Sequence, residues 1–233
     1  MGVKERQERE REEVRRKILD AARELFVAEG YRNVSIRKVA EKVEYSPAAL
    51  YGYFSSKDDL FFALAEEGFH KLFDYTNQAV RGEAPAADPL EAVREGFLRY
   101  YRFSRKHPEY FELMFVDRTV PRIGRDWERF AFVAEMIGEA CGLLQRAIDA
   151  GVFPAGLSAE VAFHILWAAA HGPATAALCE RLAPEEDPDA LARDTLEAAI
   201  AGLRAGIPIT FTPAECAEPT VLVATKRGNE HES

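Results

Sequence analysis

Between residues 46 and 53, hydroxyl-bearing side chains alternate with very small ones. The set comprises Ser46, Ala48, Ala49, Tyr51, Gly52 and Tyr53. The hydroxyl groups can hydrogen-bond to phosphates or to base edges. The small residues let another molecule come close to the backbone, and alanine methyl groups can pack on thymine methyl groups. This chemistry suits contact with duplex nucleic acid, provided that the segment is held with this face outward.

The elements that must hold it are two short helices joined by a tight turn, predicted over residues 35–54. Ser35 is the expected N-cap of the first helix. Its apolar residues have helical spacing: Ile36, Val39, Ala40 and Val43. Ser46 caps the second helix, with Pro47 in its first position. Leu50 and Phe54 lie four residues apart and can share its buried face, which leaves the other face free for a major groove.

The rest of the chain also has helical periodicity, so the expected fold class is all-α. An apolar stripe from Val14 to Phe26 predicts a first helix that ends at Gly30. Further helices are expected over residues 57–80, 89–106, 108–116, 126–150, 158–179 and 188–205. Loops are expected at 81–89 and 182–189, with irregular structure at 117–125 and a flexible tail from residue 206.

Charge is distributed unevenly along the 233 residues, whose formal net charge is −9. Residues 1–57 carry 13 basic and 10 acidic side chains, whereas the remainder carries 17 and 29. A mildly basic segment joined to an acidic body suggests two functions, one of which faces a polyanion. Cys141, Cys179 and Cys216 have neither metal-ligand nor CxxC spacing, so a disulfide framework is not expected and a reducing cytoplasm fits.

Residues 161–179 contain no Asp, Glu, Lys or Arg, which approaches the length of a membrane span. The stretch is rich in alanine and contains His164, His171 and the pair Gly172–Pro173. Alanine adds little transfer energy and imidazoles are costly in lipid. We therefore expect no membrane partner, and a buried helix at a core or at a subunit interface.

The residues from Gly30 to Leu60 form a run that resembles one known family. Gly30–Tyr31 is followed by SIRKVA at 35–40 and by YSPAALYGYFSSKDDL at 45–60. This run closely resembles the TetR family of bacterial transcriptional regulators. The resemblance implies a homodimer that binds a palindromic double-stranded DNA operator, most often as a repressor, and a helical C-terminal domain that binds a small-molecule effector. It also implies phosphate contacts from Tyr51, Tyr53 and Lys57.

The predicted DNA-binding set joins these three residues to the rest of the helix-turn-helix surface. It consists of Ser35, Arg37, Lys38, Tyr45, Ser46, Pro47, Ala48, Ala49, Tyr51, Gly52, Tyr53 and Lys57. The second helix has no Arg, Asn or Gln, which make the most discriminating base contacts. We expect affinity to rest on phosphates and DNA shape. The basic residues before Val14 are interleaved with glutamates, which favours a solvated helix with ion pairs over an arm that enters the minor groove.

Glu44 departs from the family, which usually has glycine at this place in the turn. If the position needs a positive φ, glutamate costs about 1 kcal/mol. Its carboxylate would also repel phosphates unless Arg37 or Lys42 pairs with it. This substitution and the acidic net charge slightly favour a second hypothesis, a small-molecule carrier or sensor with weakened DNA binding.

Aromatic residues concentrate between residues 97 and 115. The aromatic residues there, with Met114, are Phe97, Tyr100, Tyr101, Phe103, Tyr110, Phe111 and Phe115. Core packing explains each of them, and a cavity for an apolar effector is the sharper interpretation. His164, Trp167 and His171 share one face of a later helix, as core residues or as polar contacts to an effector. The predicted effector-binding set is Phe103, Tyr110, Phe111, Met114, Phe115, His164, Trp167 and His171. The spacing provides no metal site, and no cofactor is expected.

These patterns predict a helix-turn-helix DNA-binding domain in residues 1–57, ordered from about residue 10. A larger effector-binding and dimerisation domain is expected in residues 58–205 and a tail in 206–233. Small-residue faces on the last two helices suit a four-helix dimer interface, although intramolecular packing alone would also explain the same residues. We expect a cytoplasmic repressor and not an enzyme, because no GxSxG, phosphate loop or catalytic Cys–His pair is present. An activator would use the same DNA-binding head, and the effector's identity is open.

Overall fold

The computed structural model describes residues 2–82, 88–121 and 128–213, and within these ranges every regular element is helical. The first elements are α1 (Val3–Glu29), the 3₁₀ turn η1 (Tyr31–Asn33), α2 (Ile36–Lys42), α3 (Pro47–Tyr51) and α4 (Lys57–Gly82). Then come α5 (Pro89–Lys106), α6 (Pro108–Phe111) and the π-helical turn η2 (Glu112–Val116). The last three are α7 (Ala131–Asp149), α8 (Ala159–Leu178) and α9 (Pro188–Arg204). The all-α prediction is confirmed.

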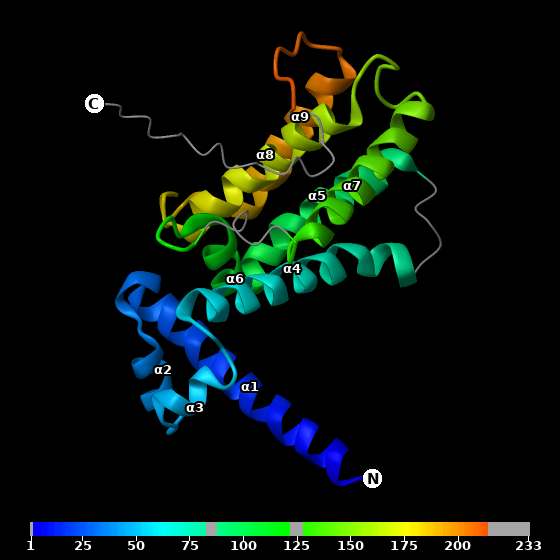
Figure 1. Cartoon of the computed structure of the whole chain (residues 1–233). Helices are drawn as coiled ribbons and strands as arrows, with labels where there is room; N and C mark the ends of the chain where they lie inside the picture. The colour runs from blue at the N-terminus through cyan, green and yellow to red at the C-terminus, as the bar shows by residue number, and fades with distance from the viewer. Residues whose placement is uncertain (1, 83–87, 122–127, 214–233) are drawn as a thin grey trace, which may run out of the picture.

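Helices α1, α2 and α3 form a small head at one end of the molecule (Figure 1). Ile18 and Phe26 on α1 are buried together with Leu50 and Phe54 from the α3 region. The chain leaves α1 at Gly30, whose φ of 78° and ψ of 148° define a conformation that glycine alone adopts readily. Gly30 thus directs η1 and α2 back against α1.

The cap residues predicted from the sequence are confirmed. Ser35 accepts a hydrogen bond from the Lys38 amide at 3.2 Å, and Ser46 accepts one from the Ala49 amide at 3.1 Å. Ser158, with which the predicted helix over residues 158–179 begins, caps α8 in the same way. Each side chain satisfies an amide that has no partner within its own helix, so these helices begin where the sequence predicts.

Several boundaries differ from the prediction. Helix α1 begins at Val3, earlier than residue 10, because consecutive charged residues with (i, i+4) ion pairs continue the helix beyond its apolar stripe. Helix α3 ends at Tyr51, three residues before Phe54, where Gly52 and Tyr53 form a turn. Residues 128–130 form a turn before α7. Residues 112–116 wind as a π-helical turn and not as the second half of an α-helix.

The larger helical part surrounds a second region of the core. Helix α8 packs against α9, α5 and α7, and α4 runs between the head and this bundle (Figure 1). Helix α8 is long and apolar enough to cross a membrane by length and composition, yet only 28% of its most apolar 18-residue window is buried in the single chain. Most of the other α8 residues are partly exposed, and Ala168 and Gly172 are exposed. Residues 206–213 form no helix or strand, and the remainder of the predicted tail lies outside the described residues.

Candidate nucleic-acid interface and sensor core

Helix α3 is held from one side only. Leu50 is fully buried and Phe54 is 2% exposed, whereas Tyr51 is 57% exposed. Tyr45, just before the helix, is 39% exposed. The buried pair fixes the helix on the head, and its opposite face presents hydroxyl groups to solvent.

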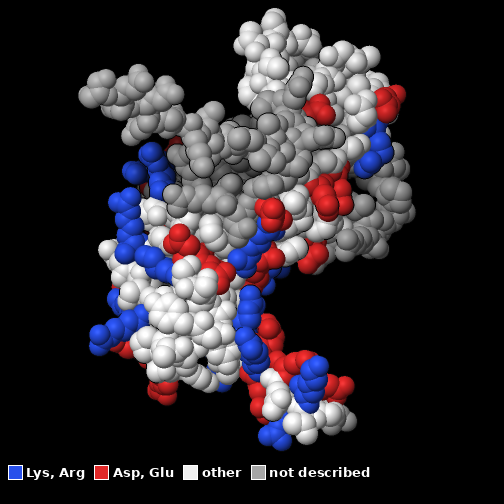
Figure 2. Space-filling model, viewed as in Figure 1, with Lys and Arg blue, Asp and Glu red and all other residues white. Residues whose placement is uncertain are grey.

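The exposed surface of α3 has little charge of its own. Residues 45–56 contain no charged side chain, and the face of the head seen in Figure 2 is largely uncharged. Ser46, Pro47, Ala48 and Gly52 are exposed, while Ala49 and Tyr53 are partly buried. Because the Ser46 oxygen accepts the cap bond, its hydroxyl proton remains available to a phosphate or a base. Ser35 has the same arrangement at the start of α2.

The turn between α2 and α3 places residue 44 in the left-handed region, although this chain has glutamate there and the family usually has glycine. Glu44 has a φ of 60°. Its amide donates to the Glu41 carbonyl at 3.2 Å, and the Tyr45 amide donates to the Ala40 carbonyl at 3.0 Å. These two bonds form a Schellman motif with Glu44 at the position where glycine is usual. Glutamate therefore carries backbone strain there, as the sequence predicts conditionally.

Neither neighbouring cation neutralises Glu44. Arg37 pairs with Glu41 at 3.0 Å, and Lys42 pairs with Glu24 at 3.0 Å. Within the described residues Glu44 makes no ion pair, and its exposed carboxylate stands at the edge of the predicted DNA surface.

Two other predicted contact residues are held within the protein. Lys57 donates to the Tyr31 carbonyl at 2.9 Å and lies 4.1 Å from the centre of the Tyr31 ring. Lys38 pairs with Glu29 at the end of α1. Lys57 thus ties the start of α4 to η1. Burial and a hydrogen bond to Asp58 raise the pKa of Tyr31.

In the larger helical part, four aromatic rings surround His171. Trp167 stacks on the imidazole at 4.7 Å between ring centres, and Phe111 and Phe115 lie at 5.4 and 5.7 Å. The fourth ring is that of Tyr100, whose hydroxyl lies 2.8 Å from Nδ1 of His171. Burial lowers the pKa of His171, so its imidazole is neutral at pH 7. We call these five residues the aromatic cluster; they combine apolar rings with a neutral hydrogen-bonding pair.

The other predicted effector contacts lie outside the aromatic cluster. Phe103 packs against Tyr75 and His107, with ring centres 6.2 and 5.1 Å away. His164 bonds to a backbone carbonyl of its own helix and faces Phe211, two turns away from His171. His164 and His171 share one face of α8, but they lie in different surroundings at different points along the helix.

Tyr110 and Met114 lie on the side of α6 and η2 that faces α4. The Tyr110 hydroxyl donates to Glu67 Oε1 at 2.5 Å and accepts a hydrogen bond from Arg23 at 2.7 Å. Burial and the bond to Glu67 raise the pKa of Tyr110 to about 12. Met114 packs beside Gly68, where a Cβ atom would collide with its sulfur. A larger residue at position 68 would therefore require the Met114 side chain to shift.

Sequence reasoning missed the polar contacts between the head and the bundle. Arg16 on α1 donates to Glu67 at 2.7 Å and pairs with Asp20 at 2.9 Å. Tyr100 also belongs to the aromatic cluster but was not a predicted contact. Its partner lies 71 residues along the chain, and no local spacing identifies such a pair.

Two family models account for most of this architecture. Residues 18–64 match the bacterial regulatory proteins of the tetR family, and residues 93–199 match the tetracyclin repressor-like C-terminal domain. The chain belongs to the TetR family. Its members are DNA-binding transcriptional regulators, and the resemblance found in the sequence is confirmed.

Individual relatives agree with this assignment. The transcriptional repressor NicS of Pseudomonas putida is 26% identical over 134 residues, which span 58% of this chain and 61% of NicS. The repressor Rv1474c of Mycobacterium tuberculosis is 29% identical over 76% of this chain and 87% of its own length. The structure of the regulator FadR from Bacillus subtilis in complex with stearoyl-CoA has a TM-score of 0.66 and 17% identity. It covers 80% of this chain and 97% of FadR. At that identity the likeness shows the fold.

Proposed function

We propose that this protein is a cytoplasmic homodimeric repressor that binds a palindromic operator and is released by a small, largely apolar effector. The observation that carries the proposal is α3, which Leu50 and Phe54 anchor while the hydroxyl of Tyr51 faces solvent. An uncharged recognition helix gains affinity mainly from phosphates and DNA shape. We therefore expect strong salt dependence and modest base discrimination.

The open face of α8 supports the dimer. Val161, Ile165, Ala168, Gly172 and Ala176 follow one another at helical spacing, and none of them is fully buried in the single chain. The small residues in the second half of this apolar stripe let a second helix approach closely, and α9 lies beside α8 to complete a four-helix interface with a partner subunit.

The aromatic cluster supports the effector. Its rings supply apolar contact area, and Tyr100 and His171 supply one neutral hydrogen-bonding pair. FadR binds stearoyl-CoA, and a long acyl chain is one ligand with the required apolar character. We expect thermal stabilisation by apolar or acyl compounds. Stabilisation by highly polar compounds alone would refute the apolar effector.

A footprint on the DNA that flanks the protein's own gene tests the proposal. We expect protection of a palindrome at about physiological salt, and Tyr51→Ala should need about fivefold more protein for the same protection. If the folded dimer protects nothing even at low salt, selection from random DNA separates a remote operator from the carrier hypothesis. A reporter gene placed behind the protected site distinguishes repression from activation.

Gly172 offers a direct test of the dimer interface. A Cβ atom at Gly172 would meet nothing within 4 Å in the single chain, so Gly172→Arg should leave the subunit folded. Gly138 on α7 is equally open and provides the matched control. We expect Gly172→Arg to give a monomer by light scattering and Gly138→Arg to remain dimeric. If both variants remain dimeric, the dimer interface does not include Gly172.

A further inference from the structure

The N-terminal half of α1 runs alongside the DNA-binding head and contacts it beyond the shared core. Arg11 donates from Nη2 to the carbonyl oxygen of Gly52 at 3.1 Å. Gly52 is the C-cap of α3. The same guanidinium lies 5.5 Å from the centre of the Tyr53 ring. One turn further along α1, Arg15 lies 5.3 Å from the ring of Phe54. Two arginines four residues apart therefore contact two consecutive aromatic residues.

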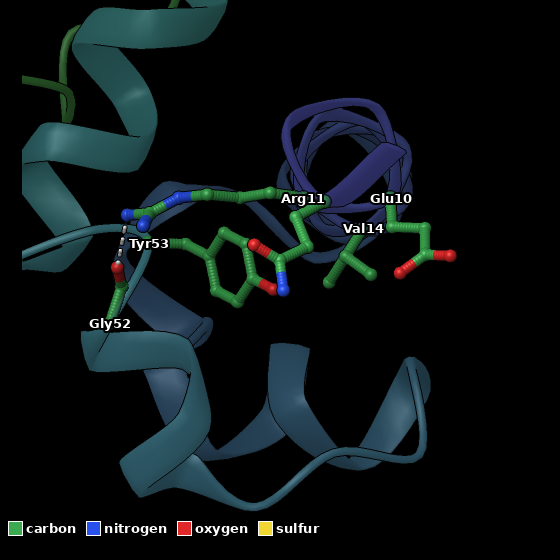
Figure 3. A pocket seen from close by; sticks show the side chains of 6 residues that line it. Glu10, Arg11, Val14, Gly52 and Tyr53 are labelled. Carbon is green, nitrogen blue, oxygen red and sulfur yellow. Dashed lines mark hydrogen bonds between the residues drawn. The ribbon is translucent and has the colours of Figure 1, made fainter. Parts of the chain in front are cut away.

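Figure 3 shows how the Arg11 side chain extends from α1 to the end of α3, with its guanidinium above Gly52 and beside Tyr53. An open hollow of about 460 Å³ lies between the two elements, lined by Gln7, Glu10, Arg11, Val14, Gly52 and Tyr53. Arg11 spans this hollow with its hydrogen bond to Gly52.

We propose that Arg11 is a positioning residue for DNA recognition: it caps the carboxyl end of α3 and orients Tyr53, which makes the N-terminal extension of α1 part of the DNA-reading unit. This inference rests on the proposed role of α3 as the recognition helix. A cation is favoured at the negative end of a helix dipole, where it can bond to carbonyls that have no partner in the helix. A flat guanidinium also stacks on an aromatic ring, whereas lysine provides only a point charge.

Because α3 is short, the contact of Arg11 with its carboxyl end contributes to holding it in place. The helix spans only residues 47–51, and Leu50 is its single buried side chain. A five-residue helix has too few internal hydrogen bonds to be stable alone. Beyond the anchor formed by Leu50 and Phe54, its orientation therefore depends on contacts at its ends. These contacts are Ser46 and Pro47 at the start and Arg11 at the finish.

The test uses the full-length protein with three substitutions. Arg11→Ala removes the bond and the ring contact, and Arg11→Lys keeps the charge but loses the planar group. Arg6→Ala is the matched control, because Arg6 is a 75% exposed arginine on the same helix whose ion pair is with Glu10. The probes are the operator from the footprint and a mixed-sequence duplex at low salt.

Hydrogen exchange of residues 47–54 in the DNA-free protein is measured first. We expect faster exchange in Arg11→Ala and Arg11→Lys, and no change in Arg6→Ala. Because this readout needs no DNA, it separates failure of this inference from failure of the proposed function. Unchanged exchange in Arg11→Ala would overturn the inference.

Affinity and its salt dependence are measured next. Arg11→Ala should lose about five- to tenfold in operator affinity. The slope of log affinity against log salt should stay that of the unmodified protein, since no phosphate contact is removed. A slope smaller by about 0.9 would instead identify Arg11 as a phosphate contact. Operator affinity restored by Arg11→Lys would show that charge alone matters, which refutes the proposal. A lower melting temperature of Arg11→Ala with unchanged affinity would show a purely structural role, which refutes it as well.

Discussion

Replacing Glu44 with glycine should stabilise the protein. The residue has a φ of 60°, and an L-residue in the left-handed region costs about 1–2 kcal/mol. Glycine avoids this cost but makes the unfolded chain more flexible, which offsets about 0.4–1 kcal/mol. Glu44→Gly should therefore raise the free energy of unfolding by about 0.5–1 kcal/mol.

A second residue in the same conformation provides the control. Glu180 follows α8 with a φ of 51°. Its amide donates to Ala177 at 3.3 Å and the Arg181 amide donates to Ala176 at 2.9 Å, which is again a Schellman motif. Glu180→Gly should relieve similar strain at the end of α8, outside the helix-turn-helix. Glu44→Gln completes the set, because it removes the charge and keeps the strain.

Urea unfolding followed by circular dichroism measures the strain, and operator affinity at two salt concentrations measures the charge. We expect Glu44→Gly to gain both stability and affinity, Glu44→Gln to gain affinity alone, and Glu180→Gly to gain stability alone. The affinity gains should shrink at high salt, where charges are screened. If Glu44→Gly loses stability while Glu180→Gly gains it, the carboxylate of Glu44 makes a contribution that outweighs strain, and the reasoning is refuted.

Three further predictions follow. Tyr51→Ala and Lys57→Ala should weaken binding to all DNA sequences alike, by about fivefold each. Only Lys57→Ala should also lower the melting temperature, because Lys57 bonds to the protein interior and Tyr51 is exposed; altered sequence preference without loss of affinity would contradict the phosphate role. Burial alone would raise the pKa of Glu67, but bonds from Tyr110 and an arginine outweigh it and lower that pKa. Its contribution to stability is thus present above the unfolded pKa of about 4.3 and is lost as pH falls through the folded value. Tyr110→Phe should lower the free energy of unfolding by about 1–2 kcal/mol at pH 7. This difference from the unmodified protein should become smaller below about pH 4.5. A difference that does not change with pH would contradict this assignment. The lowered pKa of His171 means that the unfolded chain binds its proton first, so stability should fall as pH drops below about 6.5. His171→Gln should reduce the loss of unfolding free energy between about pH 7.5 and about pH 5.5. An equal loss in the variant and the unmodified protein would show that burial of this imidazole does not cause it.

Local structure could be predicted where one residue determines one interaction. Ser35, Ser46 and Ser158 each precede an apolar helical pattern, and each forms the cap bond that its position implies. The strain at Glu44 could be predicted only conditionally, from the glycine that the resembling family usually has at this place, and the φ of 60° meets that condition. These features depend on neighbours within five residues and need no knowledge of the tertiary fold.

The aromatic-rich stretch could not be divided correctly from its sequence. Tyr110 and Phe111 are adjacent, yet one bonds to Glu67 on α4 and the other packs on His171 of α8. The periodicity predicts one continuous helix here, while η2 winds as a π-helical turn directly after α6. The wider turn changes which side chains share a face, and local spacing does not reveal it.

This division places α6 between the two halves of the molecule. On one side Tyr110 receives a hydrogen bond from Arg23 of α1 and donates to Glu67 of α4. On the other side Phe111 forms part of the aromatic cluster around His171. Both residues are at most 2% exposed, so α6 cannot shift without disturbing packing in both places. We expect a compound that displaces Phe111 also to disturb the contacts of Tyr110 with Arg23 and Glu67. The effect of Tyr110→Phe on operator affinity measures this coupling.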